Sequence, residues 1–437
     1  MTSIYCANSD AKLLSSNSEF LVRLYGTKNQ SPQGLAIGNG LWGEIRRLNV
    51  LPNQRAFDFL SIALSVASAD QFISRLAYGT TGFQRRIELT VALGSPDIWN
   101  EVSGLLESIL NFLTGDRWVL IFEDGGERAP TRLDQKGLRN FNSIHSCNAV
   151  CLFSGGMDSF MGVNQILQSE IPLLVSRSPT GDQKCQNALS SLMGNVARFA
   201  VNDAPAFGSL SDTDRETSTR GRSLLFIALA VLCASAMHSF KKSIVPIYIP
   251  ENGFIAINPP LTIRRIGANT TRTAHPHYLS LLTELLKAVD LPSEITNPFR
   301  FDTKGEILTR MKKDAVIAEH ICDTVSCGHW HRHNVQCGRC WPCLIRRSSM
   351  HKAGIDDNTC YETLNLSSIV TNESLRTDLW AALSAIGQYD EKGRAARPYR
   401  SIRHLPRDPF LREKYLSVID RGFEELREFL FEQGVWS

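Results

Sequence analysis

Six residues between an apolar stretch and a helical pattern have the composition of an anion-binding loop. The sequence CNAVCLFSGGMDSFMGVNQIL, from Cys147 to Leu167, contains Ser154-Gly155-Gly156-Met157-Asp158-Ser159. The two glycines let the backbone turn without Cβ clashes, and the free N–H groups at the start of the following helix point back at the loop. The hydroxyl groups of Ser154 and Ser159 add donors on either side. The stretch therefore predicts a site for a phosphate or pyrophosphate group.

This loop differs from two common nucleotide-binding patterns. It lacks G-x-x-x-x-G-K-[ST], so transfer of a terminal phosphoryl group is not indicated, and it is not G-x-G-x-x-G. The alternative without function is a glycine turn in an ordinary α/β sheet.

A second group of residues has the spacing of a metal site. Cys337, Cys340 and Cys343 form C-x-x-C-x-x-C, and Cys327 lies ten residues upstream. Two C-x-x-C steps place three sulfurs around one point, and a returning loop can add a fourth to complete the tetrahedron that Zn²⁺ prefers. We expect these four cysteines to bind Zn²⁺ in a folding role, because four protein ligands leave no open position.

Other ligand sets remain open for this segment. One of three histidines in the intervening loop could replace Cys327, and Cys322 is a weaker competitor; the histidines are His329, His331 and His333. The same thiols could hold an iron–sulfur cluster. The chain has eleven cysteines, an odd number, and the remainder are scattered, which favours metal over disulfides.

The elements around the loop alternate between strand and helix patterns. Strand-like runs occur at 149–153, 171–175, 244–249 and around 295, and helical patterns at 158–169, 186–199, 221–240, 277–289 and 304–313. Short apolar strands alternating with helices predict an α/β fold, a parallel sheet with helices on both faces. Ligands of such sheets bind at the carboxyl ends of the strands, where the glycine loop is expected.

Residues 1–125 are expected to form a smaller α+β unit without visible chemistry, in a structural or docking role. Ile87, Leu89, Val91 and Leu93 alternate with mostly polar neighbours, as a half-buried strand does. Further expected elements are helices at 55–69 and 99–113 and a strand at 118–122.

Composition divides the rest of the chain. Residues 126–147 are rich in Gly and charge and indicate a linker. Residues 148–400 form the main α/β domain, which includes the cysteine segment 327–343, and 401–437 form a helical C-terminal extension. No internal repeat is visible in the sequence.

Net charge argues against nucleic acid as a partner, and the distribution of apolar residues argues against a membrane. Forty-seven Lys and Arg stand against 44 Asp and Glu, a formal charge of +3, so no direct nucleic-acid binding is expected. The N-terminus lacks the pattern of a signal peptide, and no run of eighteen apolar residues occurs. We expect a cytoplasmic protein with no membrane partner.

The glycine loop resembles the S-G-G-x-D-S loop of the PP-loop ATP pyrophosphatase superfamily. Loop and cysteines in this order, followed by Arg346 and Arg347, resemble the 7-cyano-7-deazaguanine synthase family, QueC, over about residues 148–355. TSTRGRSLLFIALAVLCA resembles the family's G-R-N helix, with Arg222 at the arginine, and FDTKGEIL resembles its T-K-x-E-I stretch, with Lys304. NPPLTIRRIGANTTRTAHPHYL, with Arg272 and His275-Pro276, resembles its middle loop.

The resemblance implies that ATP is split between its α and β phosphates while a carboxylate takes the AMP. It implies that a 7-carboxy-7-deazaguanine becomes an amide and then, with a second ATP, a nitrile, and that zinc is bound. Pyrophosphate and Mg²⁺ would be held by Ser154, Gly155, Gly156, Asp158 and Ser159. Catalytic residues would be Asp158, Ser159, Lys304 and Arg222, the two cations neutralising developing charge. Without the resemblance, Arg222 and Lys304 would be read as ordinary surface cations.

The sequence departs from the family in three places. The usual G-Q-x-H appears as Gly181-Asp182-Gln183-Lys184, Ser223 replaces an asparagine, and residues 1–125 have no counterpart in the minimal enzyme. These differences argue against the standard nitrile product, and the added domain favours a different amine acceptor, for instance a protein N-terminus or a lysine presented by a partner. Ammonia remains the alternative acceptor.

Long QueC-like proteins with such an N-terminal extension occur in bacterial anti-phage operons, among them the QatC-type proteins of Qat systems, which this chain resembles. The predicted function is an ATP-dependent ligase of anti-phage defence that acts on a deazapurine carboxylate, with a partner from the same operon bound through the N-terminal domain. The alternatives are a queuosine-pathway synthase for tRNA modification and an inactive nucleotide-binding module that docks a partner.

Overall fold

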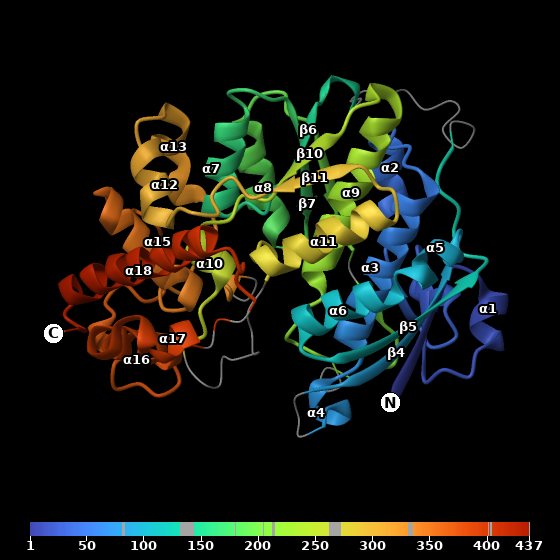
Figure 1. Cartoon of the computed structure of the whole chain (residues 1–437), viewed down its shortest axis with the longest axis horizontal. Helices are drawn as coiled ribbons and strands as arrows, with labels where there is room; N and C mark the ends of the chain where they lie inside the picture. The colour runs from blue at the N-terminus through green and yellow to red at the C-terminus, as the bar shows by residue number, and fades with distance from the viewer. Residues whose placement is uncertain are drawn as a thin grey trace.

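The computed structural model in Figure 1 describes residues 1–80, 84–131, 144–179, 181–203, 205–211, 215–261, 272–330, 335–400, 402 and 404–436. Within these residues the chain forms two open sheets, the helices that cover them, and a helical C-terminal part.

The second sheet carries the glycine loop and is parallel throughout. Its strand order is β11-β10-β6-β7-β8. The strands are β6 (Ala149–Leu152), β7 (Pro172–Arg177), β8 (Arg198–Val201), β10 (Val245–Tyr248) and β11 (Ser293–Thr296). The helices that follow them are α7 (Met157–Ile166), α8 (Asp182–Ser191), α9 (Arg222–Lys241), α10 (Gly253–Ile257), α11 (Pro276–Ala288) and α12 (Lys304–Met311). The predicted parallel α/β sheet is confirmed.

One predicted helix in this half is wrong over its second part. The pattern at 186–199 was expected to be helical throughout, but α8 ends at Ser191 and residues 198–201 form β8. Gly194 has φ +75°, a left-handed conformation that stops a helix, and Arg198–Val201 then pairs with β7. Pairing with β7, more than twenty residues earlier in the chain, makes residues 198–201 a strand. The spacing of apolar residues in this segment does not reveal that pairing.

The first sheet has the order β5-β4-β1-β2-β3-β9, and its strands are parallel except for β9. They are β1 (Thr2–Ala7), β2 (Phe20–Leu24), β3 (Leu35–Ile37), β4 (Arg86–Leu93), β5 (Arg117–Asp124) and β9 (Ala206–Phe207). Between them lie α1 (Asp10–Ser15), α2 (Leu41–Leu48), α3 (Gln54–Phe72), α4 (Arg75–Tyr78), α5 (Pro96–Glu101) and α6 (Ser103–Thr114). The expected α+β character is therefore wrong, because helices connect parallel strands. The edge strand β9 comes from the part of the chain between β8 and β10 of the second sheet.

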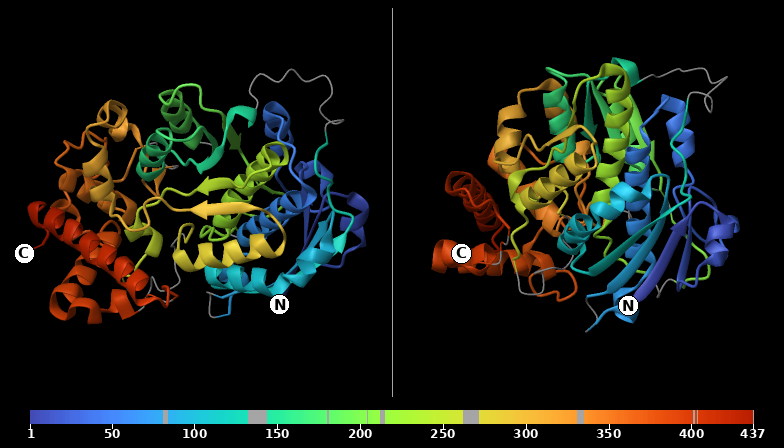
Figure 2. Two further views of the ribbon diagram at one scale, coloured as in Figure 1. Left: turned by 45° about the horizontal axis from the view of Figure 1, so that its top comes forward. Right: turned by 45° about the vertical axis from the view of Figure 1, so that its right-hand side comes forward.

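The two sheets share one strand order. Counting only the parallel strands along the chain, each sheet runs fifth, fourth, first, second, third. Helix α3 lies on the first sheet, α9 lies on the second, and the two pack side by side between the sheets (Figure 2). Helices α6 and α11, which precede the last strand of each sheet, also pack together. One continuous hydrophobic cluster joins both sheets through these helices.

Helix α9 is the one described segment long and apolar enough to cross a membrane by length and composition. However, 78% of that stretch is buried inside the protein, which is the environment of a core helix.

The C-terminal part packs on its own hydrophobic cluster. It contains α15 (Trp341–Ala353), α16 (Thr377–Lys392), α17 (Arg397–Arg400) and α18 (Pro409–Glu432). Helix α18 carries the apolar face expected at the end of the chain and lies against α15 and α10. The short helix α13 (Ala315–His320) precedes the cysteine segment.

The predicted linker, residues 126–147, is described only in part, because residues 132–143 lie outside the described residues. Its start packs on the first half: the Gly126 N–H donates to Leu93, and the Ala129 N–H donates to Gln54 at 2.9 Å. The division of the chain into domains stays a prediction.

Candidate active site and metal centre

The glycine loop follows β6 at the carboxyl edge of the second sheet. Gly155 has φ +80°, and a Cβ there would lie 3.1 Å from the Gln186 side chain, so glycine is required for both reasons. Gly156 is the residue before α7, whose first N–H groups have no partner within the helix and face the loop. The sequence-predicted cradle therefore has the expected strand, turn and helix.

The two serines of the loop face each other. The hydroxyl oxygens of Ser154 and Ser159 are 3.2 Å apart, and the Ser159 hydroxyl donates to the Gly156 carbonyl at 2.9 Å. The Ser154 hydroxyl also accepts the Gly156 N–H at 3.3 Å. Ser154 is exposed and Ser159 is buried, so one hydroxyl is free to turn outward while the other stabilises the turn.

Asp158 is fixed by partners from two other strands' loops. Its Oδ1 lies 3.3 Å from the Lys304 ammonium, and its Oδ2 accepts the Asn252 side-chain amide at 2.7 Å. Asn252 is fully buried and follows β10, while Lys304 is the first residue of α12. The sequence-predicted residues Asp158 and Lys304 therefore meet directly.

A cleft of about 930 Å³ opens above this loop. The loop after β6 and the loop after β10 border it, and β6 and β10 are the neighbours between which the chain reverses its direction of strand addition. Such a switch point is where ligands of open parallel sheets bind. The predicted site residues that line the cleft are Ser154, Gly156, Asp158, Ser159, Arg222 and Lys304, whereas Gly155 is buried behind it.

Arg222 lines the cleft as the first residue of α9. Solvent reaches its side chain through the cleft, while the protein atoms around it and the charge of Arg177 lower its pKa. An arginine remains charged under such a shift, so the cleft contains both predicted cations, Arg222 and Lys304, in addition to Arg220 and Arg339.

Glu251 is a cleft residue that the sequence analysis missed. It lies in the loop after β10 and lines the cleft beside the glycine loop. Burial and the neighbouring carboxylate of Asp158 raise its pKa to about 7, against the lowering effect of Lys304 and Arg222. A carboxyl group with this pKa can take up or release a proton at neutral pH.

The four predicted metal ligands come together. The Sγ atoms of Cys327, Cys337, Cys340 and Cys343 all lie within 4.8 Å of one another, and all four residues are buried. Backbone N–H groups of residues 329 and 337 donate to the Cys327 sulfur at 3.3 and 3.2 Å. Four converging thiols with amide donors are a donor set suited to Zn²⁺.

Two of the alternative ligands of the sequence analysis, His329 and Cys322, are not part of this group. His329 is exposed and lines the cleft, and Cys322 packs in a different cluster, beside the second sheet. His331 and His333 lie outside the described residues. The four crowded thiols differ in pKa. Hydrogen bonds with the other cysteines of the group lower the pKa of Cys337 and raise the pKa of Cys343.

Hydrogen bonds connect the cysteine segment to the glycine loop. The buried guanidinium of Arg346, on α15, donates to the Thr324 carbonyl at 3.0 Å, and so does the Gln336 side chain. The next residue, Val325, donates its N–H to the Gly155 carbonyl at 3.0 Å. The metal centre is therefore placed to hold the back of the loop.

Two residues matched by resemblance lie elsewhere. Arg272 stacks over the Phe112 ring at 4.5 Å, and His275 packs on the same ring at 5.0 Å. Burial lowers the pKa of His275 to about 3. Neither residue is among those that line the cleft. Part of the matching loop, residues 262–271, lies outside the described residues.

Comparison with known proteins gives two relatives. The 7-cyano-7-deazaguanine synthase of Hahella chejuensis (strain KCTC 2396) is 23% identical over 239 residues, covering 49% of this chain and 94% of that protein. The 7-cyano-7-deazaguanine synthase of Marinomonas sp. (strain MWYL1) is 22% identical over 236 residues, covering 49% of this chain and 98% of that protein. No family model and no solved structure matches the chain. The chain is thus QueC-like over about half of its length.

Proposed function

We propose that this protein uses ATP to adenylate the carboxylate of a 7-carboxy-7-deazaguanine-type acid and then transfers the acyl group to an amine. The single observation that carries the proposal is the glycine loop at the switch point of a parallel sheet, with Lys304 and Arg222 in the same cleft. The likeness to two 7-cyano-7-deazaguanine synthases supports the deazaguanine acid as substrate.

In the first step a carboxylate oxygen attacks the α-phosphorus of ATP and the bond to the β-phosphate bridging oxygen breaks. Pyrophosphate leaves with the bonding electrons. The backbone N–H groups of the loop and the hydroxyl of Ser154 would hold it. Lys304 and Arg222 would neutralise the charge that grows on the phosphates. Asp158 is the loop carboxylate that would hold Mg²⁺ bound with ATP, and the ion would offset the negative charge of the phosphates.

In the second step the amine nitrogen attacks the acyl carbon and AMP leaves. The attacking amine must lose a proton, and Glu251, with a pKa of about 7, stands in the cleft to accept it. At about 930 Å³ the cleft is at the upper end of the usual range for small-molecule sites, which leaves room for a nucleotide and a second substrate.

The metal centre would serve folding. Four buried cysteine ligands would complete a tetrahedral Zn²⁺ site with no position for substrate. Its role would be to fix the segment that contacts Gly155.

The proposal also includes the amine acceptor and the biological role. We propose an amine acceptor, ammonia or an amine of a partner protein, in an anti-phage defence system of the Qat type. The half of the chain outside the alignments with the two synthases supports a role beyond theirs. The partner would bind through the N-terminal sheet.

The second candidate is the reaction of the two relatives, formation of 7-cyano-7-deazaguanine, which their printed names favour. The test is incubation with 7-carboxy-7-deazaguanine, ATP, Mg²⁺ and either ammonia or the product of a neighbouring gene, followed by pyrophosphate and intact-mass measurement. A mass gain on the partner protein supports the proposal. Free nitrile as the only product selects the second candidate, and absence of pyrophosphate release contradicts both.

A variant pair tests the loop itself. Asp158→Ala removes the carboxylate between Lys304 and Asn252, and pyrophosphate release should fall at least about 100-fold because charge positioning is lost. Asp97→Ala removes an exposed carboxylate in the first turn of α5 and serves as the control. Equal rates in the two variants would exclude Asp158 from the site.

A further inference from the structure

The two cations of the cleft that we propose to act on ATP both stand at the beginning of a helix. Arg222 is the first residue of α9, and Lys304 is the first residue of α12. Where each charged group lies therefore depends on what holds the first turn of its helix. In both helices, a side chain from another part of the chain accepts a hydrogen bond from the first turn or from the residue before it.

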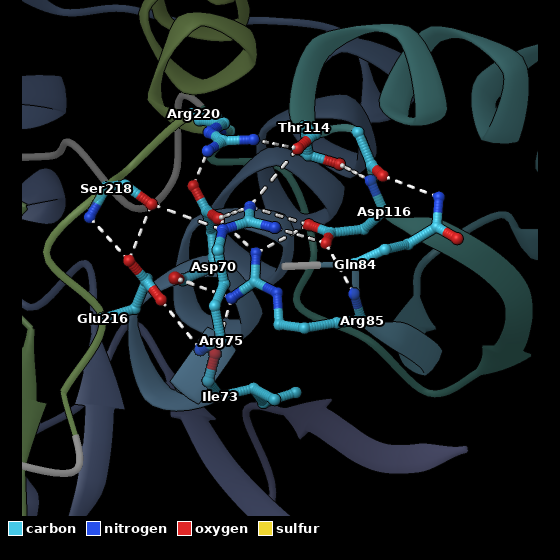
Figure 3. A network of polar contacts seen from close by, with 12 residues as sticks. Asp70, Ile73, Arg75, Gln84, Arg85, Thr114, Asp116, Glu216, Ser218 and Arg220 are labelled. Carbon is cyan, nitrogen blue, oxygen red and sulfur yellow. Dashed lines mark hydrogen bonds and ion pairs between the residues drawn. The ribbon is translucent and has the colours of Figure 1, made fainter. Parts of the chain in front are cut away.

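A buried carboxylate from the first half holds the start of α9. Asp70, on α3, is fully buried, and its Oδ2 accepts the Gly221 N–H at 2.6 Å (Figure 3). A Cβ at position 221 would lie 3.3 Å from this oxygen and 3.0 Å from the Val66 side chain, so glycine permits the close approach. The residue next to this bond is Arg222.

Ion pairs hold Asp70 in place. Its Oδ1 lies 2.6 Å from the Arg85 guanidinium, which also pairs with Asp116 at 2.7 Å. Arg75 pairs with Asp116 at 2.5 Å, and all four residues are buried (Figure 3). Buried ion networks of this kind give little net stability over apolar residues, because desolvation offsets the attraction.

The same network holds the stretch before α9, which forms a wall of the cleft. Glu216 accepts the backbone N–H of Arg75 at 2.8 Å and that of Ser218 at 2.8 Å. The Arg220 guanidinium donates to the Thr114 carbonyl at 3.0 Å. Residues 217–220 line the cleft directly. The part of the chain that forms the first sheet therefore supports one wall of the cleft, although none of its own described side chains lines the cleft.

A second buried carboxylate, from the end of the chain, holds the start of α12. Glu425, on α18, accepts the hydroxyl of Thr303, the residue before the helix, and the Gly305 N–H at 3.3 Å. A Cβ at position 305 would lie 2.7 Å from Glu425 Oε1, so glycine permits this close approach and a larger residue would displace the carboxylate. Thr303 and Gly305 flank Lys304.

We infer that Asp70 and Glu425 are positioning residues that place Arg222 and Lys304 in the cleft, although neither carboxylate lines it. A carboxylate at a helix N-terminus interacts favourably with the unpaired N–H groups of the first turn. Both carboxylates come from outside the sheet that carries the glycine loop, one from α3 and one from α18. The two parts of the chain that flank this sheet thus complete its site. The inference rests on the proposed function, in which both cations act on ATP.

The first test compares two equal substitutions in one helix. Asp70→Asn leaves one acceptor oxygen, so its amide must face either the Arg85 guanidinium or the Gly221 N–H. We expect kcat for pyrophosphate release to fall by about 10- to 100-fold. Asp58→Asn is the control, because Asp58 is equally buried on α3 but holds the backbone N–H groups of Gly94 and Ser95 instead. It should lower thermal stability by a similar amount and leave kcat unchanged.

The second test measures coupling. Asp70→Asn and Glu425→Leu are each combined with Arg222→Lys and with Lys304→Arg, which keep the charge and a measurable rate. Within a pair, Asp70 with Arg222 or Glu425 with Lys304, the second substitution should cost much less than it does alone. Across pairs the effects should multiply. Equal coupling in all four combinations would mean a general structural role and would overturn the inference.

A third readout does not depend on catalysis. Hydrogen exchange of residues 221–224 should be faster in Asp70→Asn than in Asp58→Asn, and exchange of residues 304–307 should be faster in Glu425→Leu. If the wild-type protein releases no pyrophosphate, the proposed function fails, yet exchange still reports whether the carboxylates hold the helix starts. Unchanged exchange at both sites would overturn the inference even in an active enzyme.

Discussion

Glu251 gives the cleft a titratable group near neutrality. Burial and Asp158 raise its pKa to about 7, so the carboxylate form predominates only above that pH. If it accepts the proton of the attacking amine, kcat/KM should rise between about pH 6 and pH 8 and level off above. Rate measurements across this range should show the inflection in the wild-type protein.

Glu251→Gln supplies the contrast. The amide cannot accept a proton, so the inflection near pH 7 should disappear and the rate should fall. Glu294→Gln, on the exposed side of β11, is a suitable control and should keep the wild-type profile. An unchanged inflection in Glu251→Gln would assign the titration to another group.

Site residues that are adjacent in the chain could be predicted from the sequence. Contacts between residues that only folding brings together could not. Ser154 to Ser159 form a contiguous loop whose glycines and flanking pattern reveal its conformation. Asn252 holds Asp158 from 94 residues away, and no spacing rule indicates that contact. Glu251 is likewise one carboxylate among many until β10 places it beside β6.

The cysteine segment should unfold locally without its metal. Cys340→Ser removes one of four buried ligands, so we expect bound zinc to fall from about one per chain to near zero, with lower thermal stability. Metal analysis and a thermal melt measure both effects. Pyrophosphate release should fall as well, because Val325 would no longer hold Gly155.

Cys360→Ser is the control for this change. Cys360 is exposed and lies outside the four-cysteine group, so zinc content, melting and rate should match the wild type. Full zinc content in Cys340→Ser would exclude Cys340 as a ligand. A visible absorption band of iron and sulfide in the purified protein would instead select the iron–sulfur alternative.

The contact between α18 and α12 makes stability depend on pH. Burial raises the pKa of Glu425 to about 7, above the ordinary value of 4.5. The folded state therefore binds the proton more tightly than the unfolded state. The resulting stabilisation is complete below about pH 4.5 and is lost as pH rises through 7. At 1.36 kcal/mol per pKa unit, this group lowers the free energy of unfolding by roughly 3 kcal/mol between those limits.

Glu425→Gln removes this titration. Denaturant unfolding at several pH values should give a flatter profile for the variant than for the wild type between about pH 5 and pH 8. Parallel profiles would mean that Glu425 does not titrate in this range.

Elements were predictable where local pattern and tertiary environment agree. Helices such as α9 and α11 have apolar residues at the expected spacing and lie close to their predicted ranges. The strands β1, β2 and β3 were not predicted, because pairing with their neighbours in the sheet decides them. The parallel character of the first sheet was missed for this reason.

The two sheets should not separate into stable fragments. Helices α3 and α9 pack together within one hydrophobic cluster, so deleting residues 1–125 would expose much of α9 to water. We expect the fragment 126–437 to be insoluble or unfolded, as judged by expression and circular dichroism. A soluble fragment that releases pyrophosphate would contradict this expectation and the positioning role of Asp70 together.

Cleavage without deletion is the control. A protease site placed in the predicted linker, between residues 132 and 143, should yield two pieces that co-elute and remain active. Their association would show that the contacts between the sheets, and not the covalent connection, hold the halves together.

The shared strand order has a consequence for assembly. A protein with only one such sheet would leave the counterpart of α9 with an apolar flank, which a second identical subunit could cover by a two-fold pairing. Here α3 already occupies that place in the same polypeptide. Within this one chain, α3 and α9 therefore bury each other between two sheets of the same strand order, and the glycine loop follows the first strand of the second sheet.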